Sequence, residues 1–333
     1  MTASVLSMRP TAARYLLLAA VALGAVGMVR AEAPDLARAL AFRDLEPVRA
    51  WLADAPESTA AVWRARAALA RIESADTVED LLDAARAAHP DDAGLVLQQA
   101  ATALDELDAG DGRFERMREA RAVGRLLEHA LELDPDHPEA LAAAIGFHRD
   151  VPRIAGGRED RVPALVARLA EIAPAHAARV RFEAARRAGR DAAALEAIDR
   201  AVRLDPLQRP GWRVLQAATL GRVGRVDDAV AQLEALVADV PAYGPAWYHL
   251  GRWISAGEGP PERGIEALQR YLLMPSWPGD PGVAVALVEL AALKRRAGDA
   301  EGARRALDQA RILDPVAVDE VVDEPVDDKA PIP

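Results

Sequence analysis

The chain has 333 residues, of which 51% are hydrophobic, and this is ample to bury a core. Its 52 acidic and 41 basic residues give a net charge of -11, which argues against nucleic acid as a partner because no broad positive surface would meet the phosphates. The absence of cysteine excludes disulfides, thiol catalysis and cysteine-ligated zinc or iron-sulfur centres. Aromatic residues make up only 4% and alanine is the commonest side chain, which favours closely packed helices over a sheet.

Residues 1–31 have the layout of a secretory signal peptide. Three arginines and no acid accompany an apolar run from Tyr15 to Val29, which is shorter than the about 20 residues that a membrane-spanning helix needs. Val29-Arg30-Ala31 then places small residues at both positions that a signal peptidase inspects. The sequence predicts cleavage after Ala31 and a periplasmic or secreted product. An uncleaved membrane anchor is the alternative.

The rest of the chain is divided by prolines at regular spacing. Because a proline cannot extend the helix that precedes it, each one marks the end of a helical stretch. The stretches end at Pro56, Pro90, Pro135, Pro174, Pro206, Pro241, Pro275 and Pro315, at intervals of 34, 45, 39, 32, 35, 34 and 40 residues. Between them the pattern is helix, short turn, helix, so the seven intervals indicate about seven hairpins.

One repeat signature is especially clear. Trp247-x2-Leu250-Gly251-x2-Ile254 resembles the W-x2-L-G-x2-Y pattern of tetratricopeptide repeat (TPR) proteins, with isoleucine in place of the aromatic. A small residue followed four positions later by a large apolar one recurs as Ala194 and Ile198, Ala229 and Leu233, Gly264 and Leu268, and Ala303 and Leu307. The small side chains would let the two helices of a hairpin approach closely. Glycines make the turns before them, at Gly189, Gly224 and Gly298.

The resemblance to exported bacterial TPR proteins implies an all-α, right-handed superhelical solenoid of stacked antiparallel helical hairpins, in which each hairpin covers the apolar stripe of the next. We expect divergent TPR-like hairpins over residues 32–174, TPR repeats over 175–316 and a disordered acidic tail over 317–333. Extra residues at 109–113, 150–161 and 276–282 should form surface loops.

No catalytic or metal-binding pattern is present in the sequence. The six histidines contain no His-Glu-x-x-His and no pair four residues apart. The glycine-containing segments lack the Gly-Lys-Ser/Thr of a phosphate-binding loop, and residues 108–112 lack the closing glutamate of a calcium loop. We therefore expect no enzyme activity, no metal and no cofactor.

Seven aromatic side chains fall between residues 212 and 277. Trp212, Trp247 and Tyr271 occupy repeat-signature positions and are interpreted as core. Tyr248 and Arg252 lie four residues apart, on one face of a first helix, and Arg213 is equivalent to Tyr248 in the preceding repeat. In the proteins that this chain resembles, that face lines the concave groove and holds peptides. Arg213, Tyr248 and Arg252 are thus the predicted partner-binding residues, and a solvated arginine-rich face is the alternative.

The functional prediction is an exported scaffold that binds a protein or peptide segment through its concave groove and supports the assembly of an envelope complex. A second hypothesis is an accessory component of a substrate-binding-protein-dependent transporter, in which the solenoid encloses a small apolar ligand. Insertions near Gly156 and Trp277 would line such a pore. The sequence favours no oligomeric state.

Overall fold

A computed structural model describes residues 33–56, 59–73, 77–109, 113–205, 207–277 and 279–315, and within these ranges every regular element is a helix. The predicted signal peptide and the predicted acidic tail lie outside the described residues. The α-helices are α2 (Leu36–Phe42), α3 (Glu46–Asp54), α4 (Ala60–Ile72), α5 (Val78–Ala88), α6 (Ala93–Ala109), α7 (Arg113–Leu133), α8 (Pro138–Asp150), α9 (Val162–Ile172), α10 (Pro174–Arg187), α11 (Asp191–Leu204), α12 (Pro210–Arg222), α13 (Val226–Asp239), α14 (Gly244–Ala256), α15 (Pro261–Leu272), α16 (Val283–Arg296) and α17 (Ala300–Leu313). Two short 3-10 helices, η1 (Arg153–Ala155) and η2 (Glu159–Arg161), connect α8 to α9.

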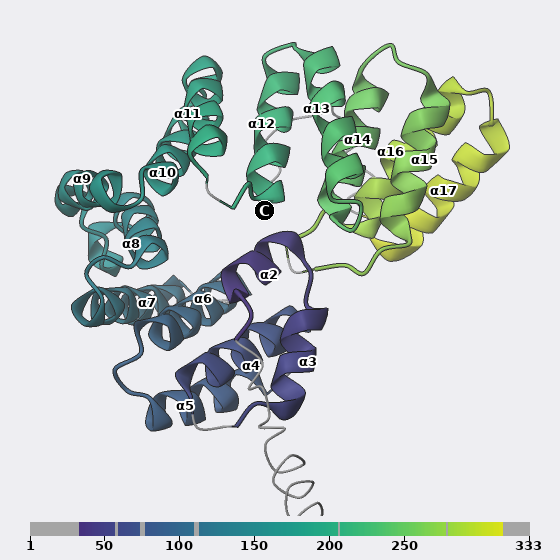
Figure 1. Cartoon of the computed structure of the whole chain (residues 1–333). Helices are drawn as coiled ribbons and strands as arrows, with labels where there is room; N and C mark the ends of the chain where they lie inside the picture. The colour runs from purple at the N-terminus through teal and green to yellow at the C-terminus, as the bar shows by residue number, and fades with distance from the viewer. Residues whose placement is uncertain are drawn as a thin grey trace, which may run out of the picture.

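Consecutive helices pair into antiparallel hairpins, from α2 with α3 to α16 with α17 (Figure 1). In the C-terminal half the first helices α12, α14 and α16 pack on one another, while each second helix contacts its own partner and the first helix that follows it. This arrangement confirms the predicted all-α solenoid of stacked hairpins. No helix of the described ranges is both long and apolar enough to cross a membrane.

The hairpin turns depend on glycine, as the sequence predicts. Gly189, Gly224 and Gly298 have φ angles of 64°, 82° and 82°, in the left-handed region that a residue with a Cβ enters at a cost. Each lies between the two helices of one hairpin. Prolines separate the hairpins themselves: Pro90 and Pro275 lie between hairpins, and Pro174 begins α10.

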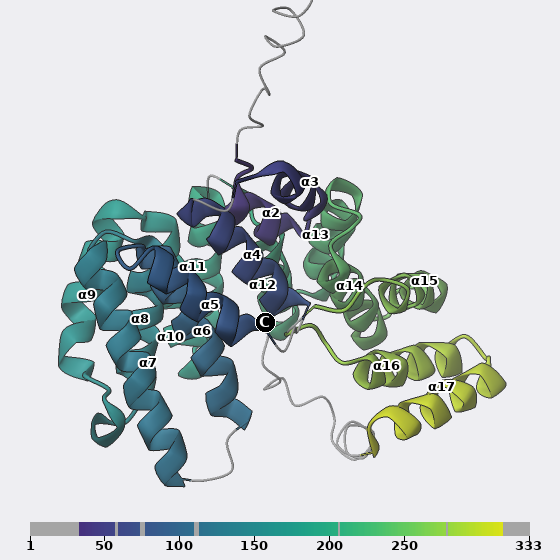
Figure 2. The ribbon, with the colours of Figure 1, turned by 90° about the horizontal axis from the view of Figure 1, so that it is seen from below.

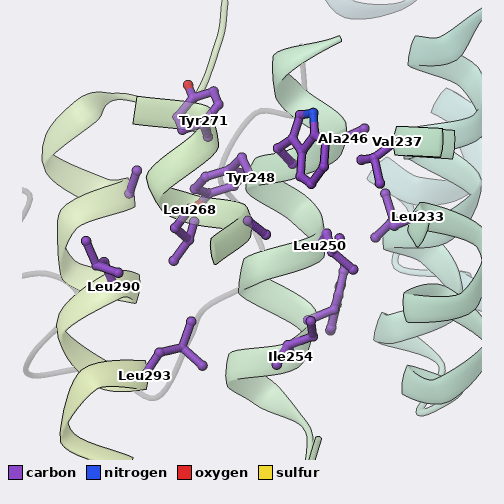
Figure 3. Packing of buried hydrophobic residues seen from close by; sticks show 14 of the residues in the cluster. Leu233, Val237, Ala246, Tyr248, Leu250, Ile254, Leu268, Tyr271, Leu290 and Leu293 are labelled. Carbon is purple, nitrogen blue, oxygen red and sulfur yellow. The ribbon is translucent and has the colours of Figure 1, made fainter. Parts of the chain in front are cut away.

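The small positions of the second helices are where the hairpins close. Ala194 and Ala229 are fully buried. At Gly264, an added Cβ atom would lie 3.0 Å from Ile254 Cγ2 and 2.8 Å from Leu293 Cδ1. Ile254 belongs to α14 and Leu293 to α16, so Gly264 lets α15 fit between them (Figure 3). The large apolar core of the C-terminal half extends from α12 to α17 across these contacts.

The two halves of the solenoid meet at the N-terminal helix. Helix α2 lies between the N-terminal hairpins and α12, so the described chain curves through almost a closed ring (Figures 1 and 2). Leu36, Leu40 and Trp51 pack in one cluster with Trp277, which belongs to the loop between α15 and α16. The loop expected at 276–282 therefore does not only face solvent, because it contacts the opposite end of the chain.

Candidate partner-binding site

Tyr248 does not lie on an exposed face. Its residue is only 4% exposed, and its ring packs 5.5 Å from the Tyr271 ring and 5.1 Å from the His249 ring (Figure 3). Burial raises the pKa of Tyr248 to about 12. The expected exposure of this side chain is therefore wrong. The reason is that α14 is covered on several sides by α12, α13, α15 and α16, so that most of its residues are buried whichever way they point.

Arg252 lies beside Tyr248 and Glu289, whereas Arg213 is paired separately with Asp239. Arg252 Nε lies 4.0 Å from Glu289 Oε1 on α16, and the two side chains are 14% and 12% exposed. Burial raises the pKa of Glu289, while the charge of Arg252 lowers it. Arg213 Nη2 donates a 2.9 Å hydrogen bond to Asp239 Oδ2 at the end of α13. Each arginine thus joins neighbouring helices.

The core interpretation of the signature aromatics is supported by their burial. Trp247 and Tyr271 are 8% and 6% exposed, and Trp247 Nε1 donates a 2.9 Å hydrogen bond to the carbonyl oxygen of Pro241. The signature tryptophan therefore holds the proline that ends the preceding hairpin. Trp212 is half-buried, with its ring 5.4 Å from the His176 ring and the Arg209 guanidinium 4.7 Å from its centroid.

A more extended hollow lies elsewhere, on the inner side of the N-terminal hairpins. We call this the inner cavity. It has a volume of about 580 Å³ and is built from first helices α4 and α6, helices α2 and α3, the start of α8 and the residue before α12. Its lining residues are Ala33, Pro34, Leu36, Ala37, Leu40, Val48, Trp51, Ala61, Arg64, Ala65, Gly94, Leu97, Gln98, His137, Glu139 and Arg209.

The inner cavity combines an apolar lining with a few polar groups. Gln98 Nε2 donates a 3.0 Å hydrogen bond to the carbonyl oxygen of Arg64, while the buried Gln98 Oε1 finds no hydrogen-bond partner within the described ranges. A buried amide oxygen without a partner is costly, and a donor from a bound molecule would satisfy it once a neighbouring side chain moves aside. The cavity as it stands can thus accept apolar side chains.

Charged and titratable side chains also line the inner cavity. Glu139 lies 3.4 Å from His137 Nδ1 and 3.5 Å from His176 Nε2, and hydrogen bonding to these rings lowers the pKa of Glu139. The same contact raises the pKa of His137. Arg209 bonds the buried carboxylate of Asp205 and stacks on Trp212. These charges are held in place by their own partners.

A second hollow, of about 490 Å³, lies between α7 and the insertion at residues 150–161. Glu128 accepts hydrogen bonds there from Arg161 and, at 3.0 Å, from His148 Nε2, and the contact with Arg161 lowers the pKa of Glu128. Arg121 Nη2 donates a 2.7 Å bond to the carbonyl oxygen of Ile154. These bonds tie the insertion to α7. Within the described residues, no cluster of three or more His, Cys, Asp or Glu side chains is arranged to hold a metal ion.

The sequence reasoning missed the inner cavity because it lies in the hairpins that match the repeat pattern weakly. A usable signal was present, however. Ala61, Ala65 and Gly94 are small residues on α4 and α6, and their size leaves space on the face that the first helices turn inward.

No protein-family model and no curated protein matches the chain. Among solved structures, the APC/C hetero-tetramer Cut9–Hcn1 is 15% identical with a TM-score of 0.56, covering 94% of this chain and 60% of that chain. A monomeric mutant of IFIT1 with m7Gppp-AAAA is 13% identical with a TM-score of 0.55, covering 84% of this chain and 65% of that one. YrrB, described as a TPR protein with an unusual peptide-binding site, is 15% identical with a TM-score of 0.42, covering 60% of this chain and 98% of that chain. The chain thus spans less than two thirds of the first two structures. The stacked hairpins and the likeness to the first two of these structures together show that the chain has the fold of tetratricopeptide repeat proteins.

Proposed function

We propose that this chain is a non-catalytic scaffold that holds a peptide segment of a partner protein in the inner cavity. The observation that carries the proposal is the composition of that cavity: apolar side chains from successive first helices, with the unsatisfied Gln98 Oε1 among them. An extended or helical segment offers apolar side chains to the lining and a backbone N–H to the amide oxygen. Arg64 and Arg209 line the cavity as well, and each is paired with a carboxylate of this chain, Asp92 and Asp205.

Photo-cross-linking tests this proposal in the full-length protein. A benzophenone amino acid placed at Leu97 in the cavity should capture one partner segment, identified by mass spectrometry of the cross-linked peptide. The matched control is the same amino acid at the exposed Arg304 on α17. Capture of the same segment at Arg304 and none at Leu97 would place binding on the outer surface and contradict the proposal.

Arg213, Tyr248 and Arg252 form the second proposed contact region. Arg213 and Arg252 lie on the first helices α12 and α14, and a partner carboxylate would compete with Asp239 and Glu289 for their guanidinium groups. The buried Tyr248 would support α14 rather than touch the partner. Arg252→Glu should weaken capture of the cross-linked segment by about tenfold, which corresponds to roughly 1.4 kcal/mol. An unchanged affinity would remove this region from the site.

A small apolar ligand is the second candidate occupant. The volume of about 580 Å³ is within the range of small-molecule pockets, and the lining is largely apolar. Native mass spectrometry of the purified protein separates the two candidates. A bound mass of a few hundred daltons, lost when Leu97 is replaced by Asp, would support the transporter-accessory hypothesis over peptide binding.

The signal-peptide layout of residues 1–31 supports the periplasm or the outside of the cell as the proposed compartment. Removal of those residues should leave Glu32 as the first residue of the mature protein. The intact mass of protein isolated from its native host tests this. A mass that includes residues 1–31, found for protein recovered from membranes, would indicate an uncleaved anchor instead. The scaffold would then be attached to the membrane where it supports an envelope complex.

A further inference from the structure

The guanidinium of Arg43 is enclosed by the opposite end of the chain. It lies 4.8 Å from the centroid of the Tyr243 ring and 4.8 Å from that of the Trp277 ring. Its two terminal nitrogens donate to the two carboxylate oxygens of Asp280, one of them at 2.6 Å. The side chains of Arg43 and Asp280 are 11% and 1% exposed. We call Tyr243, Trp277 and Asp280 the arginine pocket.

The chemistry of the arginine pocket is specific for a guanidinium group. Two aromatic rings favour a flat, delocalised cation, and a carboxylate that accepts two parallel bonds matches the fork of arginine but not the single ammonium of lysine. Asp280 is held for this contact, because Oδ2 also accepts a 3.1 Å hydrogen bond from the backbone N–H of Trp277. Tyr271 fixes the same loop by donating its hydroxyl to the carbonyl oxygen of Pro281.

The segment that carries Arg43 is a short helix with one fully buried residue. Helix α2 has seven residues, and Ala39 is the one that is buried. Arg43 itself has a φ of 59°, in the left-handed region that a residue other than glycine enters at a cost. Short elements with few buried side chains open at low free energy. The arginine pocket therefore adds a polar contact to the packing of Leu36 and Leu40 and to the contact with α12, which also keep α2 in place.

The position of α2 controls the inner cavity. Leu36, Ala37 and Leu40 of α2 form part of its lining, so displacement of α2 removes a wall. A displacement of α2 large enough to withdraw Arg43 from the pocket would therefore also open the inner cavity.

We propose that the arginine pocket is a binding site for an arginine side chain, that Arg43 is its resident ligand, and that an arginine on an incoming helical segment replaces Arg43 and frees the inner cavity. The pocket stands on its own contacts. Its link to partner binding in the inner cavity rests on the proposed function above.

The first experiment asks whether the pocket binds arginine in trans. The full-length Arg43→Ala variant, shown to be folded by circular dichroism, is titrated with a fluorescent peptide of residues 33–45. We expect saturable binding, at least tenfold weaker binding to the wild-type protein, whose pocket is filled, and at least tenfold weaker binding of the peptide that carries lysine at position 43. Equal affinity for the arginine and lysine peptides, or no binding to the folded variant, would overturn the proposal.

Because Arg43→Ala leaves the buried Asp280 without its partner, Arg43→Lys serves as a second host that keeps a positive charge in the pocket. The arginine peptide should displace the lysine side chain there and bind more tightly than to wild type. Since the titration uses only a segment of this chain, its failure would refute the arginine pocket and leave the cross-linking test of the proposed function unaffected.

A second experiment measures release of α2 directly, by trypsin cleavage after Arg38 and Arg43. Asp280→Asn should speed this cleavage at least tenfold. The matched control is Asp228→Asn, which breaks an exposed ion pair with Arg225 on α13 and should leave the rate unchanged. Equal rates for the two variants would show that Asp280 does not hold the segment.

Discussion

Replacement of Gly264 by leucine should push the last two hairpins apart. A Cβ at this position would lie 2.8 Å from Leu293 Cδ1 and 3.0 Å from Ile254 Cγ2, so a leucine here would have to displace side chains on the helices at both sides of α15. Overpacking of this kind costs about 1 to 3 kcal/mol. The loss of a mid-helix glycine returns about 0.5 to 1 kcal/mol. The net destabilisation therefore lies between about 0 and 2.5 kcal/mol, with a central value of about 1 kcal/mol.

The matched control is Gly146→Leu. Gly146 also lies inside a helix, α8, but a Cβ there meets no atom within 4 Å, so it gains helix propensity without a clash. Thermal unfolding followed by circular dichroism should place Gly264→Leu below wild type by about 2 to 8 °C and Gly146→Leu at or above it. Gly259→Leu, whose Cβ would lie 3.9 Å from Ile254 Cγ2, should fall between them. Equal melting temperatures for Gly264→Leu and Gly146→Leu would refute the close-packing argument.

Three further predictions concern single positions. Tyr248→Ala should lower the free energy of unfolding by about 3 to 5 kcal/mol in a urea titration, because the ring is buried. A loss below about 1 kcal/mol would contradict the buried position of this side chain. Gly157→Ala should destabilise the insertion by more than 2 kcal/mol, since the new Cβ would lie 1.6 Å from the Val151 carbonyl oxygen, and hydrogen exchange of the loop amides would detect it. Burial lowers the pKa of His249 to about 3. Because the unfolded state therefore binds a proton at a higher pH than the folded state, the free energy of unfolding should decline as the pH falls from about 6.5 towards 3. His249→Phe should reduce that decline by a few kcal/mol relative to wild type, and parallel pH profiles of the two proteins would argue against it.

The repeat register could be predicted because its determinants are local. Gly224 makes its turn through its own backbone freedom, and Gly264 is small where two helices of one hairpin meet. The offset of 35 residues that relates Trp212 to Trp247 also relates Ala229 to Gly264, so the small position can be located from the sequence.

The site could be predicted only in part, because burial depends on neighbours that a repeat pattern does not specify. The pattern places Tyr248 on a first helix, but α15 brings Tyr271 against its ring. The contact between Arg43 and Asp280 joins residues 237 positions apart. It arises from the summed curvature of every hairpin between them, and no local pattern encodes that sum.

The closure between Arg43 and Asp280 makes the solenoid sensitive to its own curvature. In an open stack, a small rotation between two hairpins changes only the position of a distant end, and stability remains a sum of neighbouring interfaces. Here the two ends are joined, so a rotation at α8 and α10, far from the closure, must either strain the Arg43 contact or be resisted by it. Over the described residues, the Arg43–Asp280 contact therefore resists changes of curvature that an open stack of hairpins would permit.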